Sequence, residues 1–171
     1  MLGDDHPTTL ITGRHFAHAL WMLGQYEVAR QLGEDTLARS RRVLGDDHPD
    51  TLIAAYNVAA ILRELGQHEA ARQLDEDTLA RSRRILGDDH PETLDFATDL
   101  AADLWALGRY DAARQLNEDT LARRRRVLGE DHPDTLISAS HLAADLRALG
   151  QHEAARQLDE DTETRRRAAG N

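Results

Sequence analysis

The stretch Leu-Gly-Asp-Asp-His-Pro-Asp-Thr-Leu, residues 44–52, decides the fold, because its parts return along the whole chain at one fixed interval. Its Leu-Gly pair recurs at 2–3, 86–87 and 128–129, and its Asp-His-Pro triplet recurs at 5–7, 89–91 and 131–133. A second Leu-Gly pair follows at 23–24, 65–66, 107–108 and 149–150. Every interval is 42 residues with no insertion, which is typical of a repeat protein.

Each 42-residue period predicts two helices. In the second period, Pro49 begins the first helix after a capping residue, Asp47 or His48. Gly66 is expected to adopt the left-handed conformation that ends this helix, and a second helix is expected over residues 68–86. Small and apolar residues then fall on one stripe of the first helix: Leu52, Ala55, Ala59 and Leu62.

One such hairpin cannot bury its apolar stripe alone, so neighbouring hairpins must stack on it. We therefore predict an all-α solenoid of four helix–turn–helix repeats, with about eight helices in total. The prediction is a single array over residues 1–171, with repeats at approximately 5–44, 45–86, 87–128 and 129–171.

Composition narrows the classes of function. Hydrophobic residues make up 40% and aromatic residues only 4%, which suits helices packed through leucine and alanine. The net charge of −10 should repel phosphates and anionic lipids, so neither nucleic acid nor membrane is an expected partner. The lack of cysteine excludes disulfides, thiolate catalysis and cysteine-based zinc sites. The N-terminus does not have the pattern of a signal peptide, and no apolar run approaches the roughly 20 residues of a membrane span, so we expect a cytoplasmic protein.

These motifs resemble a known family. The motifs that carry the similarity are Leu-Gly-x-Asp-His-Pro, then Asn57 ahead of Val58-Ala59, then Leu-Gly-Gln-x-Glu-x-Ala-Arg-x-Leu. Over essentially its whole length, the chain is similar to the tetratricopeptide repeat (TPR). The 42-residue length resembles the kinesin-light-chain subtype and its bacterial relatives. The resemblance implies a right-handed superhelix whose first helices line a concave, partner-binding groove. The subtype commonly carries Asn at the position of Asn57, and this chain departs from that pattern with His15, Asp99 and His141.

The first helices vary between repeats, whereas the second helices are nearly constant. From 24–49 to 66–91, 4 of 26 positions differ, but from 50–65 to 92–107, 9 of 16 differ. A helical wheel places most of the variable positions on one free face, opposite the apolar stripe. The predicted partner-binding groove comprises Asn57, Ile53, Ile61, Glu64, Asp95, Phe96, Asp99, Asp103, Ile137, His141 and Asp145.

The third repeat carries the main functional hypothesis. Asp95, Asp99 and Asp103 are four residues apart, so they form an acidic ridge on the free face. One interpretation is a site for a basic or arginine-rich peptide, with Phe96 adding apolar contact. The alternative is a solvated polar face, which is what most charge runs are. The free faces carry no arginine, and the run Arg123–Arg126 is interpreted as a solvated helix end.

Two further patterns allow a metal site. Asp99, Asp103 and His141 could converge from adjacent repeats, because carboxylate and imidazole groups suit several divalent ions. His15 and His18 lie three apart on one helix face. The prevalence of aspartate favours the simpler interpretation of surface residues, so no metal and no cofactor are predicted.

The remaining features indicate a binding protein. Trp21 and Trp105 occupy the same place in repeats one and three, where part-buried packing is favoured over a binding hot spot. No nucleophile–base set and no phosphate-cradling glycine loop appears, so an enzyme is not expected. We expect a protein–protein interaction scaffold that binds a protein or peptide, with a basic segment as the candidate ligand. The alternative is a structural spacer or self-assembly fragment of a larger signalling protein, with no ligand in its groove.

The two ends of the array differ. Glu163 replaces the leucine of the other second helices, and Ala168-Ala169 replaces their Val-Leu or Ile-Leu pair, as in a terminal cap. Met1-Leu2-Gly3 matches the last turn of a missing second helix. This predicts a cut from a longer array, or self-association through an uncapped N-terminal repeat.

Overall fold

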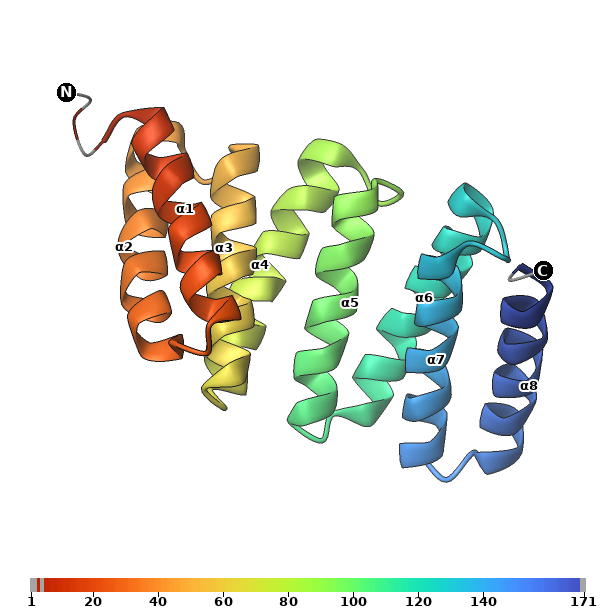
Figure 1. The fold of residues 1–171 in the computed structure, drawn as a ribbon. Helices are drawn as coiled ribbons and strands as arrows, with labels where there is room; N and C mark the ends of the chain where they lie inside the picture. The colour runs from red at the N-terminus through yellow and green to blue at the C-terminus, as the bar shows by residue number, and fades with distance from the viewer. Residues whose placement is uncertain (1–2, 4, 170–171) are drawn as a thin grey trace. The chain divides into compact units, whose positions relative to one another are not determined.

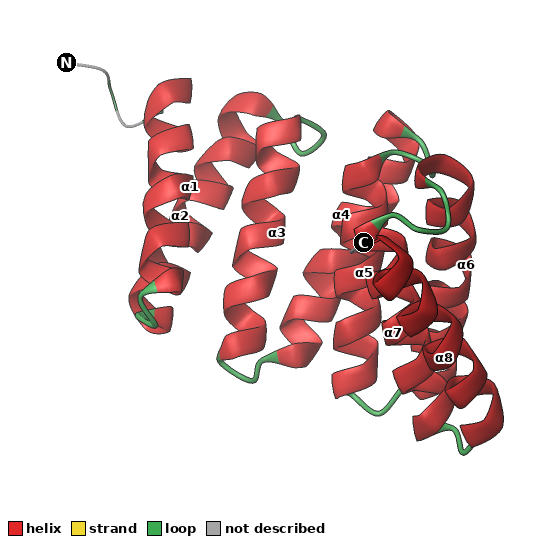
Figure 2. Ribbon diagram, turned by 45° about the vertical axis from the view of Figure 1, so that its right-hand side comes forward, coloured by secondary structure: helices red, strands yellow, loops and turns green. Residues whose placement is uncertain are grey.

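The computed structural model describes residue 3 and residues 5–169, and this part of the chain contains eight α-helices and no strand (Figures 1 and 2). The expected match of Met1-Leu2-Gly3 to a helix end falls mostly outside the described residues. None of the described helices is both long and apolar enough to cross a membrane. The helices are α1 (Pro7–Met22), α2 (Tyr26–Leu44), α3 (Pro49–Glu64), α4 (His68–Leu86), α5 (Pro91–Ala106), α6 (Tyr110–Leu128), α7 (Pro133–Ala148) and α8 (His152–Ala169).

The helices form consecutive pairs, and each predicted repeat contains one pair. The chain falls into two compact units, Met1–Ile85 and Leu86–Asn171, with two pairs in each. In the first unit α2 packs against both α1 and α3; in the second unit α6 packs against both α5 and α7. In each unit, one second helix, α2 or α6, therefore lies between the first helix of its own repeat and that of the next.

The helix starts follow from the His-Pro pairs. His48 is the N-cap of α3, and its Nδ1 accepts a hydrogen bond from the backbone N–H of Asp50 at 3.1 Å. Pro49 occupies the first turn, where a missing N–H costs nothing. The same cap begins α1, α5 and α7, through His6, His90 and His132. The histidine, not the preceding aspartate, is therefore the capping residue.

The preceding aspartate instead joins each loop to the second helix of its own repeat. Asp47 lies 2.8 Å from Arg81 and 2.5 Å from Arg84. The hydrogen bond from Arg81 is the main effect that lowers the pKa of Asp47. Equivalent ion pairs join Asp5 to Arg42, Asp89 to Arg123 and Arg126, and Asp131 to Arg165. The loop acids are thus engaged in contacts within the scaffold.

The first helices end in Schellman motifs. At the end of α3, the N–H of Gly66 donates to the carbonyl of Arg63, and the N–H of Gln67 donates to that of Leu62, both at 2.9 Å. Gly66 has φ +71°, the left-handed conformation that its sequence position predicts. The four Leu-Gly pairs at 23–24, 65–66, 107–108 and 149–150 therefore define four sharp helix ends.

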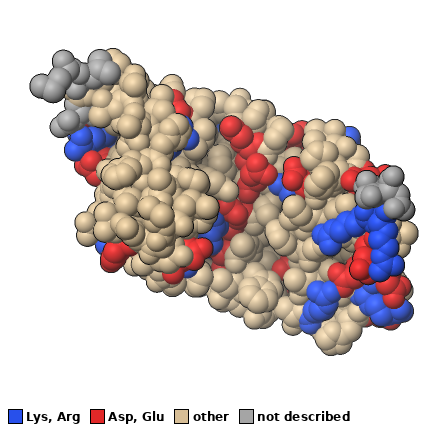
Figure 3. Space-filling model, viewed as in Figure 1, with Lys and Arg blue, Asp and Glu red and all other residues tan. Residues whose placement is uncertain are grey.

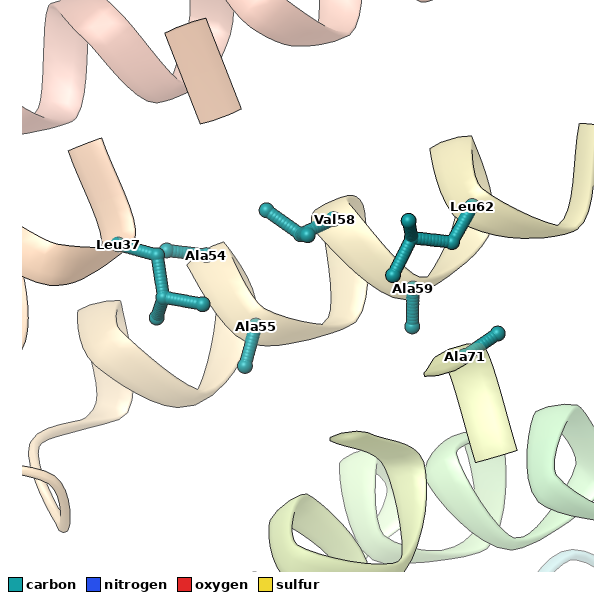
Figure 4. Close-up of a cluster of buried hydrophobic side chains, with 7 residues drawn as sticks. All are labelled: Leu37, Ala54, Ala55, Val58, Ala59, Leu62 and Ala71. Atoms are coloured by element: carbon teal, nitrogen blue, oxygen red, sulfur yellow. The ribbon is translucent and has the colours of Figure 1, made fainter. Parts of the chain in front are cut away.

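The core is built from leucine and alanine. In the first unit, one cluster joins α2, α3 and α4 (Figure 4) and comprises Leu37, Ala54, Ala55, Val58, Ala59, Leu62 and Ala71. Six of these positions recur 84 residues later in a cluster of the second unit: Leu121, Ala139, Leu142, Ala143, Leu146 and Ala155. Position 138, which corresponds to Ala54, carries serine instead. The two units therefore have matching cores, which makes them internal controls for each other.

Candidate partner-binding surface

Two cavities lie between neighbouring first helices, one in each unit. The first has a volume of about 240 Å³ and lies between α1 and α3, lined by His18, Trp21, Tyr56, Asn57, Ala60 and Ile61. The second has a volume of about 170 Å³ and lies between α5 and α7, with Asn117 of α6 also in its lining. Its other lining residues are Thr98, Ala101, Ala102, Trp105, His141, Ala144 and Asp145. The two cavities occupy equivalent places, because their lining residues include pairs that are 84 positions apart: Trp21 and Trp105, Asn57 and His141, and Ile61 and Asp145.

Each cavity has a tryptophan in its wall. Trp21 is partly buried, and its ring centroid lies 5.2 Å from that of His18. Trp105 is 46% exposed and packs edge-on against Tyr110, with 5.8 Å between the ring centroids. Both indoles therefore border a space that a ligand could enter, and Trp105 is more exposed than the packing interpretation of the sequence implies.

The predicted groove residues divide into two groups. Seven are exposed or partly exposed: Ile53, Asn57, Glu64, Asp95, Asp99, Ile137 and His141. Four are buried: Ile61, Phe96, Asp103 and Asp145. For these four, the expectation of a free helix face is wrong. Within each unit the structure brings together Asn57 with Ile61, and His141 with Asp145, as cavity lining.

Ile61 and Asp145 are buried because α3 and α7 each pack against two second helices of their own unit. In the first unit, α3 packs on α2 through Gly33, where an added Cβ would lie 3.1 Å from Val58 and 3.7 Å from Ile61. In the second unit, Asp145 of α7 accepts a hydrogen bond from Asn117 of α6 at 2.6 Å. Phe96 and Asp103 occupy the same two repeat positions as Ala54 and Ile61. The helical wheel is centred on the apolar stripe that packs within one hairpin. It therefore accounts for the contact with the second helix of the same repeat, but not for the contact with the second helix of the preceding repeat.

The acidic ridge is shorter than predicted. Asp103 is fully buried, so the accessible acids of the ridge are Asp95 and Asp99. Asp95 forms an ion pair of 2.6 Å with Arg124 of α6. The free charge of this face is therefore smaller than the sequence of α5 alone predicts.

Arg124 is the residue that sequence reasoning missed. It is only 4% exposed, and it also donates to Ser138 Oγ at 2.8 Å and to the Asp134 carbonyl at 3.2 Å. The interpretation of residues 123–126 as a solvated helix end is therefore wrong for this residue. The signal was present in the repeat: the equivalent residue is serine in the first two repeats, Ser40 and Ser82, and changes to arginine in the last two, Arg124 and Arg166.

The second cavity contains two perturbed ionisable groups. Burial is the main effect that lowers the pKa of His141; Arg124 acts in the same direction, and Asp99 opposes it. Burial also raises the pKa of Asp145, against the opposing hydrogen bond from Asn117. The site therefore favours a neutral imidazole at His141 and destabilises the ionised form of Asp145.

The metal hypotheses gain no geometric support. Within residue 3 and residues 5–169, no group of three histidine, cysteine, aspartate or glutamate side chains is arranged to hold an ion. Asp103 is buried away from the exposed face, and His18 packs against Trp21. The arrangement offers cavities and aromatic walls, which are features of a binding surface.

The eight described helices, in consecutive packed pairs with cavities between first helices, define a helical-repeat protein of the solenoid class. The chain belongs to the tetratricopeptide repeat family, which matches residues 8–84, 50–126 and 95–168. Repeats of this family generally act as non-catalytic scaffolds for protein–protein interaction.

Solved structures support the assignment. A kinesin-light-chain-like protein of Podosopora anserina with nearly identical TPR-like repeats is similar at 28% identity, with a TM-score of 0.90 over 99% of this chain and 80% of that one. A second structure of such a protein has a TM-score of 0.87 at the same identity and coverage. BtubC (BKLC) of P. vanneervenii shares the fold at 19% identity, with a TM-score of 0.88 over 95% of this chain and 65% of that one. No curated protein matches the sequence.

Proposed function

We propose that this chain holds a partner protein or peptide on the surface formed by its first helices. The observation that carries the proposal is the pair of equivalent cavities, each bordered by a tryptophan, between α1 and α3 and between α5 and α7. Tryptophan is enriched among residues that dominate binding energy at protein interfaces, and concave, mostly apolar sites are where ligands usually bind.

A basic segment is the partner that the charges favour. The chain carries a net charge of −10, and the first helices expose Glu64, Asp95 and Asp99 on the predicted groove face. Arg124 neutralises part of this charge by pairing with Asp95. Acidic residues remain in excess on these helices, so a basic peptide should bind more weakly as salt increases.

The test is a selection of peptides from a random library on the full chain, followed by affinity measurements with Trp21→Arg and Trp105→Arg combined. The scaffold should accept arginine at these positions, because Arg63 and Arg147 occupy the equivalent places in repeats two and four. We expect the selected peptides to be enriched in basic residues and to lose at least about tenfold in affinity for the variant. Circular dichroism should show that the variant keeps its helices.

Equal affinity for native chain and variant would show that the cavities are not the binding site. Failure to select any peptide would favour the second candidate function, a spacer or self-assembly element. One observation supports that candidate: the surface over α1 is largely uncharged (Figure 3), and Phe16, Met22 and Leu23 are 60%, 68% and 72% exposed. Sedimentation velocity on the native chain and on Phe16→Glu would then reveal any association through this surface.

A further inference from the structure

The cavity between α5 and α7 has a chemical character that its counterpart lacks. Asp145 and Asn117 contribute to it, and these residues are 1% and 4% exposed. At the equivalent places the first unit has Ile61 and Gly33. One cavity therefore contains a buried carboxylate, and the other contains only apolar groups at the same position.

The carboxylate of Asp145 is incompletely satisfied. Asn117 Nδ2 donates one hydrogen bond to it at 2.6 Å, and no ion pair to Asp145 exists among the residues that the structure describes. A carboxylate can accept about four hydrogen bonds, and a buried one is costly without a cation. The cavity therefore offers acceptor capacity and negative charge to an incoming donor.

The nearby cations are already engaged. Arg114, which interacts electrostatically with Asp145, forms an ion pair of 2.6 Å with Glu118. Arg124 pairs with Asp95 and also donates to Ser138. Within the chain, the charge of Asp145 is thus offset only in part, by Arg114.

The wall suits a flat cation. Trp105 packs edge-on against Tyr110 and remains 46% exposed, so its indole is available for stacking. A guanidinium group stacks on an aromatic face and forms paired hydrogen bonds with a carboxylate, which an ammonium group cannot do in the same geometry. The cavity volume of about 170 Å³ is far above the roughly 10–15 Å³ that one water molecule needs on this measure, so the cavity has room for the end of one long side chain.

We propose that the cavity between α5 and α7 binds one arginine side chain of a partner peptide, with Asp145 as its carboxylate partner and Trp105 as its stacking surface. This inference rests on the proposed function and specifies its ligand at one cavity. The cavity between α1 and α3, with Ile61 in place of the acid, has no such preference for charge.

The test uses the peptide of highest affinity from the selection described above, which is resynthesised with each arginine in turn replaced by citrulline. Citrulline keeps the shape of arginine but is neutral. For one arginine, the replacement should weaken binding to the native chain by at least about tenfold, as expected for the loss of a charge from a desolvated ion pair. With Asp145→Asn, the same replacement should change affinity by less than about twofold, while the indole resonance of Trp105 still responds to the peptide.

Ile61→Asn is the matched control in the first unit, and it should leave the citrulline effect unchanged. The proposal is overturned if no citrulline replacement matters, if the selected peptides contain no arginine, or if the effect persists in Asp145→Asn. In those cases binding that is lost with the tryptophan variants would still support the proposed function. If neither the citrulline replacements nor the tryptophan substitutions weakened binding, the interaction surface itself would be rejected.

Discussion

Single residues fix the ends of the helices in this chain. Gly66 ends α3 in the left-handed conformation, and His48 begins the helix by accepting a hydrogen bond from the N–H of Asp50. Both contacts are local, and both recur in every repeat. Substitutions at these positions should therefore change stability without changing the binding surface.

Gly66→Ala should lower the free energy of unfolding by about 1–2 kcal/mol, because its φ of +71° places a Cβ against the backbone. Gly66→Asn should cost less, because asparagine tolerates this conformation. Urea unfolding of the native chain and the two variants provides the measurement. An alanine variant as stable as the native chain would contradict the left-handed assignment.

Asp145 should make stability depend on pH in an unusual direction. Its pKa is raised above the ordinary value of 3.8 in the folded state, mainly by burial, so ionisation at neutral pH opposes folding. The native chain should therefore gain stability relative to Asp145→Asn as pH falls from 7 towards 3.8. The native chain and the Asp145→Asn variant share the residues that interact with this side chain, which are Asn117, Arg114 and Glu118.

Urea unfolding of both proteins at several pH values measures this difference. The reverse trend, in which the native chain loses stability relative to Asp145→Asn on acidification, would show that the ionised carboxylate is favoured in the fold. Such a result would also weaken the case for an unmet charge in the cavity.

At the scale of helices, contacts between a second helix and the next first helix come in matched pairs. Gly33 on α2 faces Ile61 on α3, whereas Asn117 on α6 is hydrogen-bonded to Asp145 on α7. A small residue accommodates a large apolar one in the first pair, and one hydrogen bond joins two polar residues in the second. The identity of one member therefore constrains the other.

Exchanging the second pair for the first tests this coupling. Asn117→Gly and Asp145→Ile should each destabilise the chain by about 1–3 kcal/mol, because each leaves a buried polar group without its partner. The double variant should be more stable than the sum of the single effects predicts, with a coupling of about 0.5–3 kcal/mol. The intrinsic cost of glycine in a helix cancels in this cycle. Additive effects, measured by urea unfolding, would show that the pair is not coupled.

These pairs also explain what could be predicted from the sequence. Helix starts and ends depend on neighbours along the chain, such as Pro49 and Gly66, and these were predictable. The burial of Ile61 and Asp145 depends on residues 28 positions earlier, which a wheel of one helix does not include. A comparison of the repeats does indicate these pairs. Gly33 and Ile61 are both replaced by polar residues at the equivalent positions, Asn117 and Asp145.

At the scale of the whole molecule, we expect local stability to depend mainly on neighbouring repeats and not on the array as a whole. The chain falls into two compact units, and the described helix contacts are between neighbours in sequence or one helix apart. In such arrays each repeat depends mainly on the repeats beside it. Leu62 of α3 and Leu146 of α7 occupy the same position in the two units and are 6% and 8% exposed, so they allow a matched comparison.

Leu62→Ala should lower local stability by about 2–5 kcal/mol, the range for deletion of a buried leucine side chain. Amide hydrogen exchange should then accelerate most in α3 and its neighbours, and least in α7 and α8. Leu146→Ala should give the reverse pattern. If either variant accelerated exchange equally in all eight helices, the chain would unfold as one cooperative body. A partner that binds only one cavity would then stabilise the whole array, because binding to the folded state would be linked to a single unfolding transition.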